Sequence, residues 1–237
     1  MARDVVIIDY GHGGVHRGAY QTAGKQYTFT DREPEVWIGE GLVNRCIASR
    51  LMTMLRRAGV DVYDPVAGRW VDEHRTWMEL EQRDTPLQIR AARVNAIQRE
   101  HPSAPMVSLH SNAMSAHSSG DGQRYGGVSL WTSRGQTKSD GLADELWWGL
   151  TTYDGHGFRV NRGSFDDGDV DHEADFHLLT RTVGVAVLVE SGFFDHWDDA
   201  RRLMSRAGQR LLAHSYTEGI MKWLKRERRR RELNDGL

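Results

Sequence analysis

The sequence predicts an α/β fold: a single domain with a mostly parallel central sheet of about five to six strands flanked by helices. Short apolar runs of strand length alternate with longer segments whose apolar residues recur at helical spacing. The short runs are almost continuously apolar, which is typical of parallel strands buried on both faces. A chain of 237 residues is long enough for one such domain and too short for two large ones.

Three strands and two helices are expected in the N-terminal half. Residues 5–9 are an apolar run closed by glycines, and residues 60–63 and 106–109 are similar runs. Apolar side chains at helical spacing predict a helix over residues 43–58 and another over residues 87–97. Gly59 ends the first helix, and the second ends before Pro102.

The C-terminal half continues this alternation. Residues 127–131 and 183–189 are strand candidates, residues 142–150 suit a helix, and residues 203–224 predict a long closing helix. Residues 64–85 and 153–175 do not fit the pattern. We interpret the first as an insertion and the second as a loop over the open end of the sheet. The domain is thus expected to span residues 1–224 and to be followed by a basic tail, residues 225–237.

The tail begins with the basic run KRERRRR, residues 225–231. We prefer to interpret it as a solvated helix end whose cations complement the helix dipole. The alternative is contact with an anionic polymer, membrane or nucleic acid.

The composition excludes several classes of protein. The net charge of -2 generates no strong field toward nucleic acid, so no nucleic-acid partner is expected. A single cysteine, Cys46, excludes an internal disulfide framework, and we interpret it as a small core residue. No apolar run reaches the length of a membrane span, and residues 5–8 are too short for a secretory signal. We therefore expect synthesis in the cytoplasm without a signal peptide.

Polar side chains gather at one edge of the expected sheet. His12 follows the first strand, His110 ends the third, and Glu190 ends the fifth. The carboxyl edge of an open α/β sheet is where ligands bind. Glu40 precedes the periodic stretch of the first helix and can point its carboxylate to the same edge.

Two imidazoles and one carboxylate, from His12, His110 and Glu40, form a ligand set for catalytic zinc, because they leave a fourth position open for water. Each fragment alone has a simpler explanation: a tight turn, a polar strand end, or a carboxylate that complements a helix dipole. Their coincidence at one sheet edge favours a single catalytic zinc ion (Zn2+).

Glu190 closes the apolar run VAVLV, where an ionised carboxylate is unfavourable unless it is paired or solvated in a site. One explanation is an ion pair with an arginine such as Arg181. The preferred explanation is a catalytic role, in which Glu190 takes a proton from a metal-activated water and passes it to a leaving nitrogen.

These residues lie in motifs that resemble those of the zinc-dependent N-acetylmuramoyl-L-alanine amidases, often called amidase 3. The matching stretches are residues 8–14 for IDxGHGG, Glu40 and Asn44 for ExxxN, residues 108–113 for SxHxNA, and residues 188–194 for LVExGF. Arg90 and Asn95 resemble the arginine and asparagine of the helix before the second histidine, and residues 161–163 resemble a polar-Arg-Gly turn. Tyr10 and Val185 stand where proline is usual, which puts the shape of the cleft in doubt but not metal binding.

The resemblance implies that His12, Glu40 and His110 are zinc ligands and that Glu190 is catalytic. It also implies a substrate: the amide bond between N-acetylmuramic acid and L-alanine of the stem peptide in bacterial peptidoglycan. Asn112 and Arg162 are the expected substrate-binding residues.

Alternatives remain for the bond, the activity and the biological setting. The same ligand set serves a zinc peptidase that cuts within the stem peptide, and the fold also suits a non-catalytic wall-binding or structural component. The expected setting is a phage endolysin released through a membrane lesion, or a wall-degrading part of a virion or contractile injection machine. Residues 169–177 form an acidic stretch with two histidines, which we interpret as a loop over the cleft in preference to a second metal site.

Overall fold

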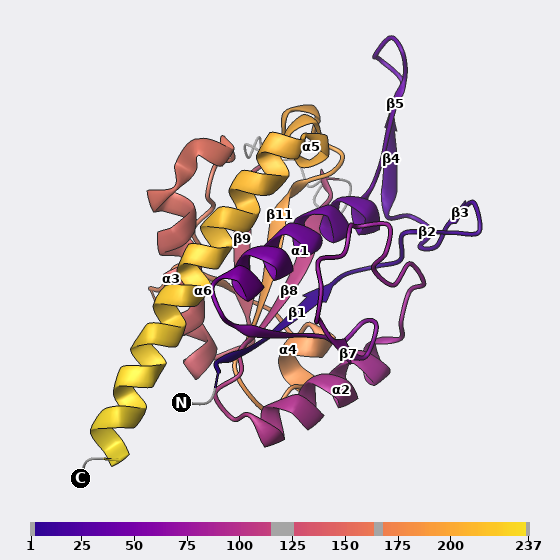
Figure 1. The fold of residues 1–237 in the computed structure, drawn as a ribbon. Coiled ribbons are helices and arrows are strands. Elements are labelled where there is room, and N and C mark those ends of the chain that lie inside the picture. Colours follow the sequence, from indigo (N-terminus) through magenta and orange to yellow (C-terminus); the bar gives the residue numbers. More distant parts are fainter. Residues whose placement is uncertain (1–2, 115–125, 164–167, 236–237) are drawn as a thin grey trace.

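The computed structural model describes residues 3–114, 126–163 and 168–235, which form one sheet with helices on both faces (Figure 1). This confirms the α/β prediction. In spatial order the strands are β10 (His172–Glu173), β9 (Ser129–Thr132), β11 (Ala186–Phe193), β8 (Met106–Asn112), β1 (Val5–Tyr10), β6 (Asp61–Asp64) and β7 (Arg69–Trp70). The sheet has seven strands rather than five to six, because the two-residue strands β7 and β10 extend its two edges.

The four central strands β11, β8, β1 and β6 are parallel, while β9 and β7 run antiparallel to their inner neighbours. The sheet is therefore mostly parallel, as predicted. Tyr10 of β1 pairs with Leu109 of β8, and His110 of β8 pairs with Glu190 of β11. The register thus brings the carboxyl ends of these strands to one edge.

Helices cover the sheet in two layers (Figure 1). One face carries α1 (Glu40–Arg57), α3 (Lys138–Thr152), α5 (Trp197–Met204) and α6 (Arg206–Asp235), and the other carries α2 (Leu87–Glu100) and α4 (His177–Arg181). Alternate residues of β1 belong to different apolar clusters: Val6 and Ile8 pack with α1 and α6, whereas Val5 and Ile7 pack with α2 and α4. Burial on both faces explains the continuous apolar runs.

Two predicted helices differ in detail from those in the structure. In α2 the buried face carries Arg90 and Gln98 beside Val94, while Ile89 is exposed. The predicted closing helix is divided into α5 and α6 at Ser205, whose backbone is extended and whose hydroxyl oxygen accepts a hydrogen bond from Gly208 N. Such a serine caps the N-terminus of the second helix.

Both segments that fit the alternation poorly contribute to the sheet or core. Residues 64–85 include β7 and bury Leu80, so this insertion packs onto the domain. Within residues 153–175, a 3-10 turn (Asp154–His156) is followed by β10, which pairs with β9. This part therefore extends the edge of the sheet rather than forming a loop over its end, and residues 164–167 lie outside the described part.

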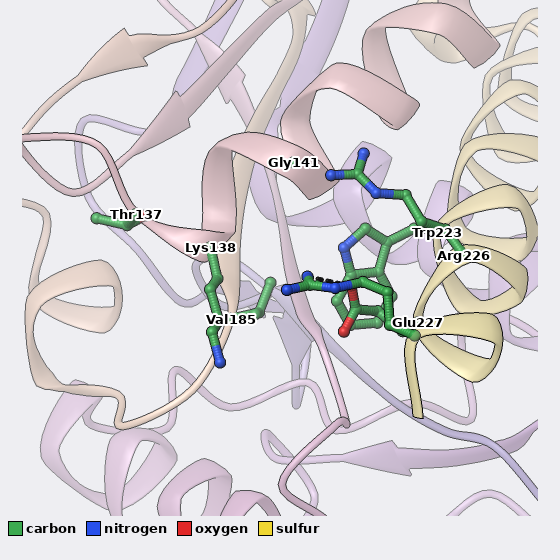
Figure 2. Close-up of a pocket in the computed structure, with 8 residues that line it drawn as sticks. Thr137, Lys138, Gly141, Val185, Trp223, Arg226 and Glu227 are labelled. Atoms are coloured by element: carbon green, nitrogen blue, oxygen red, sulfur yellow. Dashed lines mark hydrogen bonds and ion pairs between the residues drawn. The ribbon is translucent and has the colours of Figure 1, made fainter. Parts of the chain in front are cut away.

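The basic tail is helical, because α6 continues through residue 224 to Asp235. Arg228 and Arg231 form ion pairs with Asp4, and Arg226 pairs with Glu145. Figure 2 shows the pocket between this part of α6 and the start of α3, where Trp223 and Arg226 face Lys138 and Gly141. These intrachain pairs agree with a helix end better than with a free cationic tail. Within the described residues, no helix combines the length and apolarity needed to cross a membrane.

Residues 15–39, for which no element was predicted, form two hairpins between the first strand and the first helix. The first joins β2 (Val15–His16) to β3 (Ala19–Tyr20), and the second joins β4 (Gln26–Phe29) to β5 (Val36–Gly39). The β4–β5 hairpin projects from the body of the molecule (Figure 1).

Candidate active site

The turn after β1 places His12 against His110. His12 has a φ of 64°, a left-handed conformation that is uncommon for a residue with a side chain and is often found at functional sites. A Cβ atom at Gly11 would overlap the imidazole of His110. The glycine before His12 is therefore required by the close approach of the second histidine.

Three predicted ligands come together at this edge. The potential ligand atoms of His12, Glu40 and His110 all lie within 4.8 Å of one another. Glu40 Oε1 is 3.3 Å from His12 Nε2 and 3.1 Å from His110 Nδ1. Among the described residues this is the one such group of three, so the acidic stretch near His172 does not form a second.

The electrostatics of the group keep Glu40 ionised. Its side chain is 1% exposed, and burial alone acts to raise its pKa. Hydrogen bonds from His110 and His12 outweigh burial and hold the pKa of Glu40 well below its usual range. Burial acts to lower the pKa of His110, but the hydrogen bond and charge of Glu40 raise it above its usual value. Lys25 Nζ lies 3.3 Å from Glu40 Oε2 and adds a further positive charge.

A hydrogen-bond network fixes the position of Glu40. Ser111 donates its backbone N–H to Glu40 Oε1 at 3.2 Å and its hydroxyl to Asn44 Oδ1 at 3.0 Å. Asn44 in turn donates to the backbone oxygen of Gly11 at 3.2 Å. Partners of this kind orient metal ligands. Asn44 belongs to a predicted motif, whereas the contacts of Ser111 and Lys25 were missed because they join segments far apart in the sequence.

Beneath the ligands, a buried ion pair joins two strands and a helix. Asp9 is completely buried and receives hydrogen bonds from Arg90 Nη1 at 3.0 and 3.2 Å and from the Ser108 hydroxyl at 2.6 Å. Asp9, on β1, precedes His12 of the following turn by three residues, and Ser108 precedes His110 on β8 by two. The pair therefore links the strand that leads to His12 with the strand of His110, and it explains why α2 buries an arginine.

Glu190 lies beside His110 in the sheet but has different surroundings. Its Oε2 is buried and has no hydrogen-bond partner among the described residues. Burial, together with the charge of Glu40, raises the pKa of Glu190 to about 7, although His110 opposes this shift. Arg181 is exposed on α4, which precedes β11, and no ion pair joins it to Glu190 in the described structure. A carboxyl group with this pKa can give and take protons near neutral pH.

The comparison with protein families agrees with this geometry. Residues 6–222 match the sequence profile of the amidase 3 family, described as N-acetylmuramoyl-L-alanine amidase. The chain belongs to this family. No curated protein sequence matches the chain.

Solved amidase structures share its fold. An N-acetylmuramoyl-L-alanine amidase from Clostridium difficile 630 is 21% identical with a TM-score of 0.64, and the match covers 94% of this chain and 97% of that one. The apo form of an amidase from Mycobacterium abscessus is 18% identical with a TM-score of 0.65, covering 94% and 100%. The catalytic domain of an endolysin targeting Clostridia difficile is 21% identical with a TM-score of 0.54, covering 93% and 98%.

The two predicted substrate-binding residues of this amidase-family chain, Asn112 and Arg162, lie in different parts of the structure. Asn112 ends β8 two residues after His110, is half-buried, and its Oδ1 accepts a hydrogen bond from Ala113 N. Arg162 is exposed and donates to the backbone oxygens of Gly168 and Asp169 in its own loop. Asn112 thus lies at the same sheet edge as the potential metal ligands, while Arg162 hydrogen-bonds residues six and seven positions along the chain.

The two tryptophans of α3, and Trp131 of β9, contact neighbouring side chains of the fold. Trp147 packs against the apolar cluster between the sheet and α6, and Trp148 lies under Lys222 Nζ at 4.2 Å from its ring centre. His172 stacks on Trp131 with ring centres 4.6 Å apart. Trp147 and Trp148 therefore support the packing of α3.

Proposed function

We propose that this protein hydrolyses the amide bond between the lactyl group of N-acetylmuramic acid and L-alanine in bacterial peptidoglycan. The observation that carries the proposal is that two carboxylates with different surroundings, Glu40 and Glu190, lie at one edge of the sheet. Glu40 is held ionised within a group of potential metal ligands, and the buried Oε2 of Glu190 nearby has no hydrogen-bond partner among the residues that the structure describes. Membership in the amidase 3 family supports the choice of bond.

The donor set fits one zinc ion. His12, Glu40 and His110 offer two imidazole nitrogens and a carboxylate oxygen within 4.8 Å of one another, which is a three-ligand set typical of catalytic zinc. When bound, zinc polarises a carbonyl oxygen and makes water a stronger nucleophile at neutral pH.

Glu190 handles the protons in this proposal. It takes one proton from the attacking water as the water oxygen bonds to the lactyl carbonyl carbon. It then gives this proton to the alanine nitrogen as the carbon–nitrogen bond breaks, so the products are a lactyl carboxylate and a free peptide. A pKa of about 7 suits both halves of this transfer. Asn112 and Arg162 remain predictions as substrate-binding residues.

The decisive experiment is a digest of purified peptidoglycan with and without chelator, analysed by mass spectrometry. New amino termini on L-alanine of intact stem peptides are expected, with loss of activity after zinc removal and recovery on its return. Cuts within the stem peptide would instead indicate a zinc peptidase, and binding without release of soluble products would indicate a wall-binding component. Glu190→Ala, run in parallel, is expected to retain zinc and lose cleavage; activity equal to the wild type would remove Glu190 from the mechanism.

We further propose that the protein acts on the wall as a phage endolysin or as part of a virion or injection machine. The endolysin catalytic domain among the similar structures supports this setting. Release from lysing cells in the absence of assembled particles would favour the free endolysin.

A further inference from the structure

The β4–β5 hairpin begins beside Glu40, a potential metal ligand, and ends directly before it. None of the hairpin's side chains has a role in the proposed chemistry. Lys25, just before β4, accepts a hydrogen bond from Glu40 N on its backbone oxygen at 2.8 Å, and its Nζ lies 3.3 Å from Glu40 Oε2. At the other end, β5 finishes at Gly39, directly before Glu40. The hairpin therefore lies next to the group of potential metal ligands.

One face of the hairpin is directed toward the potential metal ligands His12, Glu40 and His110. Side chains alternate between the two faces of a strand, and residues paired across antiparallel strands share a face. We define the inner face as the one that Lys25 shares; along the strands it consists of Tyr27, Phe29, Val36 and Ile38. The contact of Lys25 with Glu40 orients this face toward the site. Thr28 and Trp37, which pair with each other, lie on the opposite, outer face.

The hairpin is held at both ends. At its base the Tyr20 hydroxyl donates to Lys25 O at 2.7 Å and accepts from Gly41 N at 2.9 Å. Toward its tip, Phe29 packs on Trp197 with ring centres 5.0 Å apart, and the Arg32 guanidinium lies 4.6 Å above the same tryptophan. Trp197 follows β11, the strand of Glu190, so the hairpin extends from Glu40 toward the segment after Glu190.

Tyr27 is the exposed aromatic residue of the inner face. It is 44% exposed, although Phe29 and Ile38 beside it are buried. Its ring meets Phe29 edge-on, with centres 4.8 Å apart, which fixes its orientation. Tyr27 stands about 7 Å along β4 from Lys25. A rigid, half-exposed tyrosine is typical of residues that carry binding energy.

We propose that the exposed part of the inner face, the ring of Tyr27, binds the glycan strand of peptidoglycan by packing against the face of a sugar near the muramic acid whose amide is cut. This rests on the proposed function. The strand residues of the inner face, Tyr27, Phe29, Val36 and Ile38, are all uncharged, and the cations at its two ends are already paired, Lys25 with Glu40 and Arg32 with Asp31. An uncharged aromatic ring suits a neutral chain of N-acetylated sugars, whereas a stem-peptide carboxylate would meet no free counter-ion beside Tyr27 among the described residues, because Lys25 and Arg32 already pair with Glu40 and Asp31.

The test measures binding of peptide-free glycan strands to zinc-loaded protein carrying Glu190→Gln, so that hydrolysis does not interfere. Adding Tyr27→Ala is expected to weaken binding about tenfold, the loss typical of truncating an aromatic contact residue. Tyr27→Phe should bind nearly as well as its parent, because it keeps the ring. Trp37→Ala is the matched control, since Trp37 is 41% exposed on the outer face of the same hairpin. Zinc content and thermal midpoint confirm folding for each variant.

Unchanged glycan binding by Tyr27→Ala, an equal loss in Trp37→Ala, or a loss confined to free stem peptides would each overturn this proposal. Hydrolysis of whole peptidoglycan by the wild-type protein is measured separately. If hydrolysis is normal and Tyr27→Ala binds glycan normally, this inference alone fails. If hydrolysis is absent while Tyr27→Ala still loses glycan binding, the proposed function fails and the inner face remains a glycan-binding surface.

Discussion

Glu40 and Glu190 are two carboxylates at the same edge of the sheet, and their surroundings are opposite. Glu40 Oε1 lies within 3.3 Å of His12, His110 and the backbone N–H of Ser111, and its Oε2 faces Lys25. The buried Oε2 of Glu190 has no partner in the described part of the chain. Proximity to cations and donors keeps the pKa of Glu40 low, whereas burial raises the pKa of Glu190.

This difference agrees with the roles proposed for the two residues. A metal ligand must stay deprotonated, and the environment of Glu40 ensures this. A proton-transfer group must change its charge during the reaction, and a pKa of about 7 allows Glu190 to do so. When neighbouring environments shift two pKa values apart, the acid–base assignment follows from the surroundings rather than from residue type.

Exchanging each carboxylate for an amide gives the largest expected effects and tests the assignment directly. Glu40→Gln should lower zinc affinity by more than about a hundredfold, the upper range for losing an outer partner of a ligand. Glu190→Gln should retain zinc and lose roughly 10²–10⁴-fold in turnover. Metal analysis after dialysis and rates on peptidoglycan measure both quantities. Loss of zinc from Glu190→Gln would place Glu190 among the ligands.

Asp9 extends the comparison to a carboxylate that is buried and fully paired. Arg90→Met would leave its charge buried without the guanidinium, which is expected to lower the free energy of unfolding by about 3–5 kcal/mol. Urea denaturation measures the change. Arg201→Ala is the control, because its pair with Asp198 is exposed at both ends, and it should be nearly neutral. A small loss in Arg90→Met would mean that Ser108 alone supports Asp9.

The sequence was sufficient to predict that His12, His110 and Glu190 converge, because parallel strands must end at a common edge. His12, His110 and Glu190 each follow an apolar run, so their convergence required only the fold class. The division of the last helix was missed because no glycine or proline directly adjoins Ser205, and Gly208 lies within α6. The buried face of α2 was misplaced because Arg90 is buried by a partner 81 residues away. The contacts of Lys25 and Ser111 with Glu40 were also missed, since local periodicity carries no information about such pairs.

The β4–β5 hairpin shows a different limit. Its strands have four residues each, and only part of each alternates in polarity, so the pattern was too short to predict a hairpin. Nothing in the sequence distinguishes the roles of the aromatic residues Tyr27 and Trp37. Only the register of β4 against β5 assigns them to the inner and the outer face. The proposed substrate-binding role of Tyr27 therefore depends on the structure in a way that the predicted zinc ligands do not.

Asp64 tests whether burial is the main cause of a raised carboxyl pKa in this protein, as inferred for Glu190. Burial raises its pKa from 3.8 to about 6, although Tyr10 and Ala67 donate hydrogen bonds to it. Between these pH values the folded state holds a proton that the unfolded state has released, so stability should fall as pH rises from about 4 to 6. Asp64→Asn should remove this decline and raise the free energy of unfolding at pH 7 by about 1–3 kcal/mol. Urea denaturation at pH 4 and pH 7 measures both effects. A lower stability of the variant at pH 7 would show that the ionised carboxylate is favoured by its hydrogen bonds, and the same doubt would then extend to Glu190.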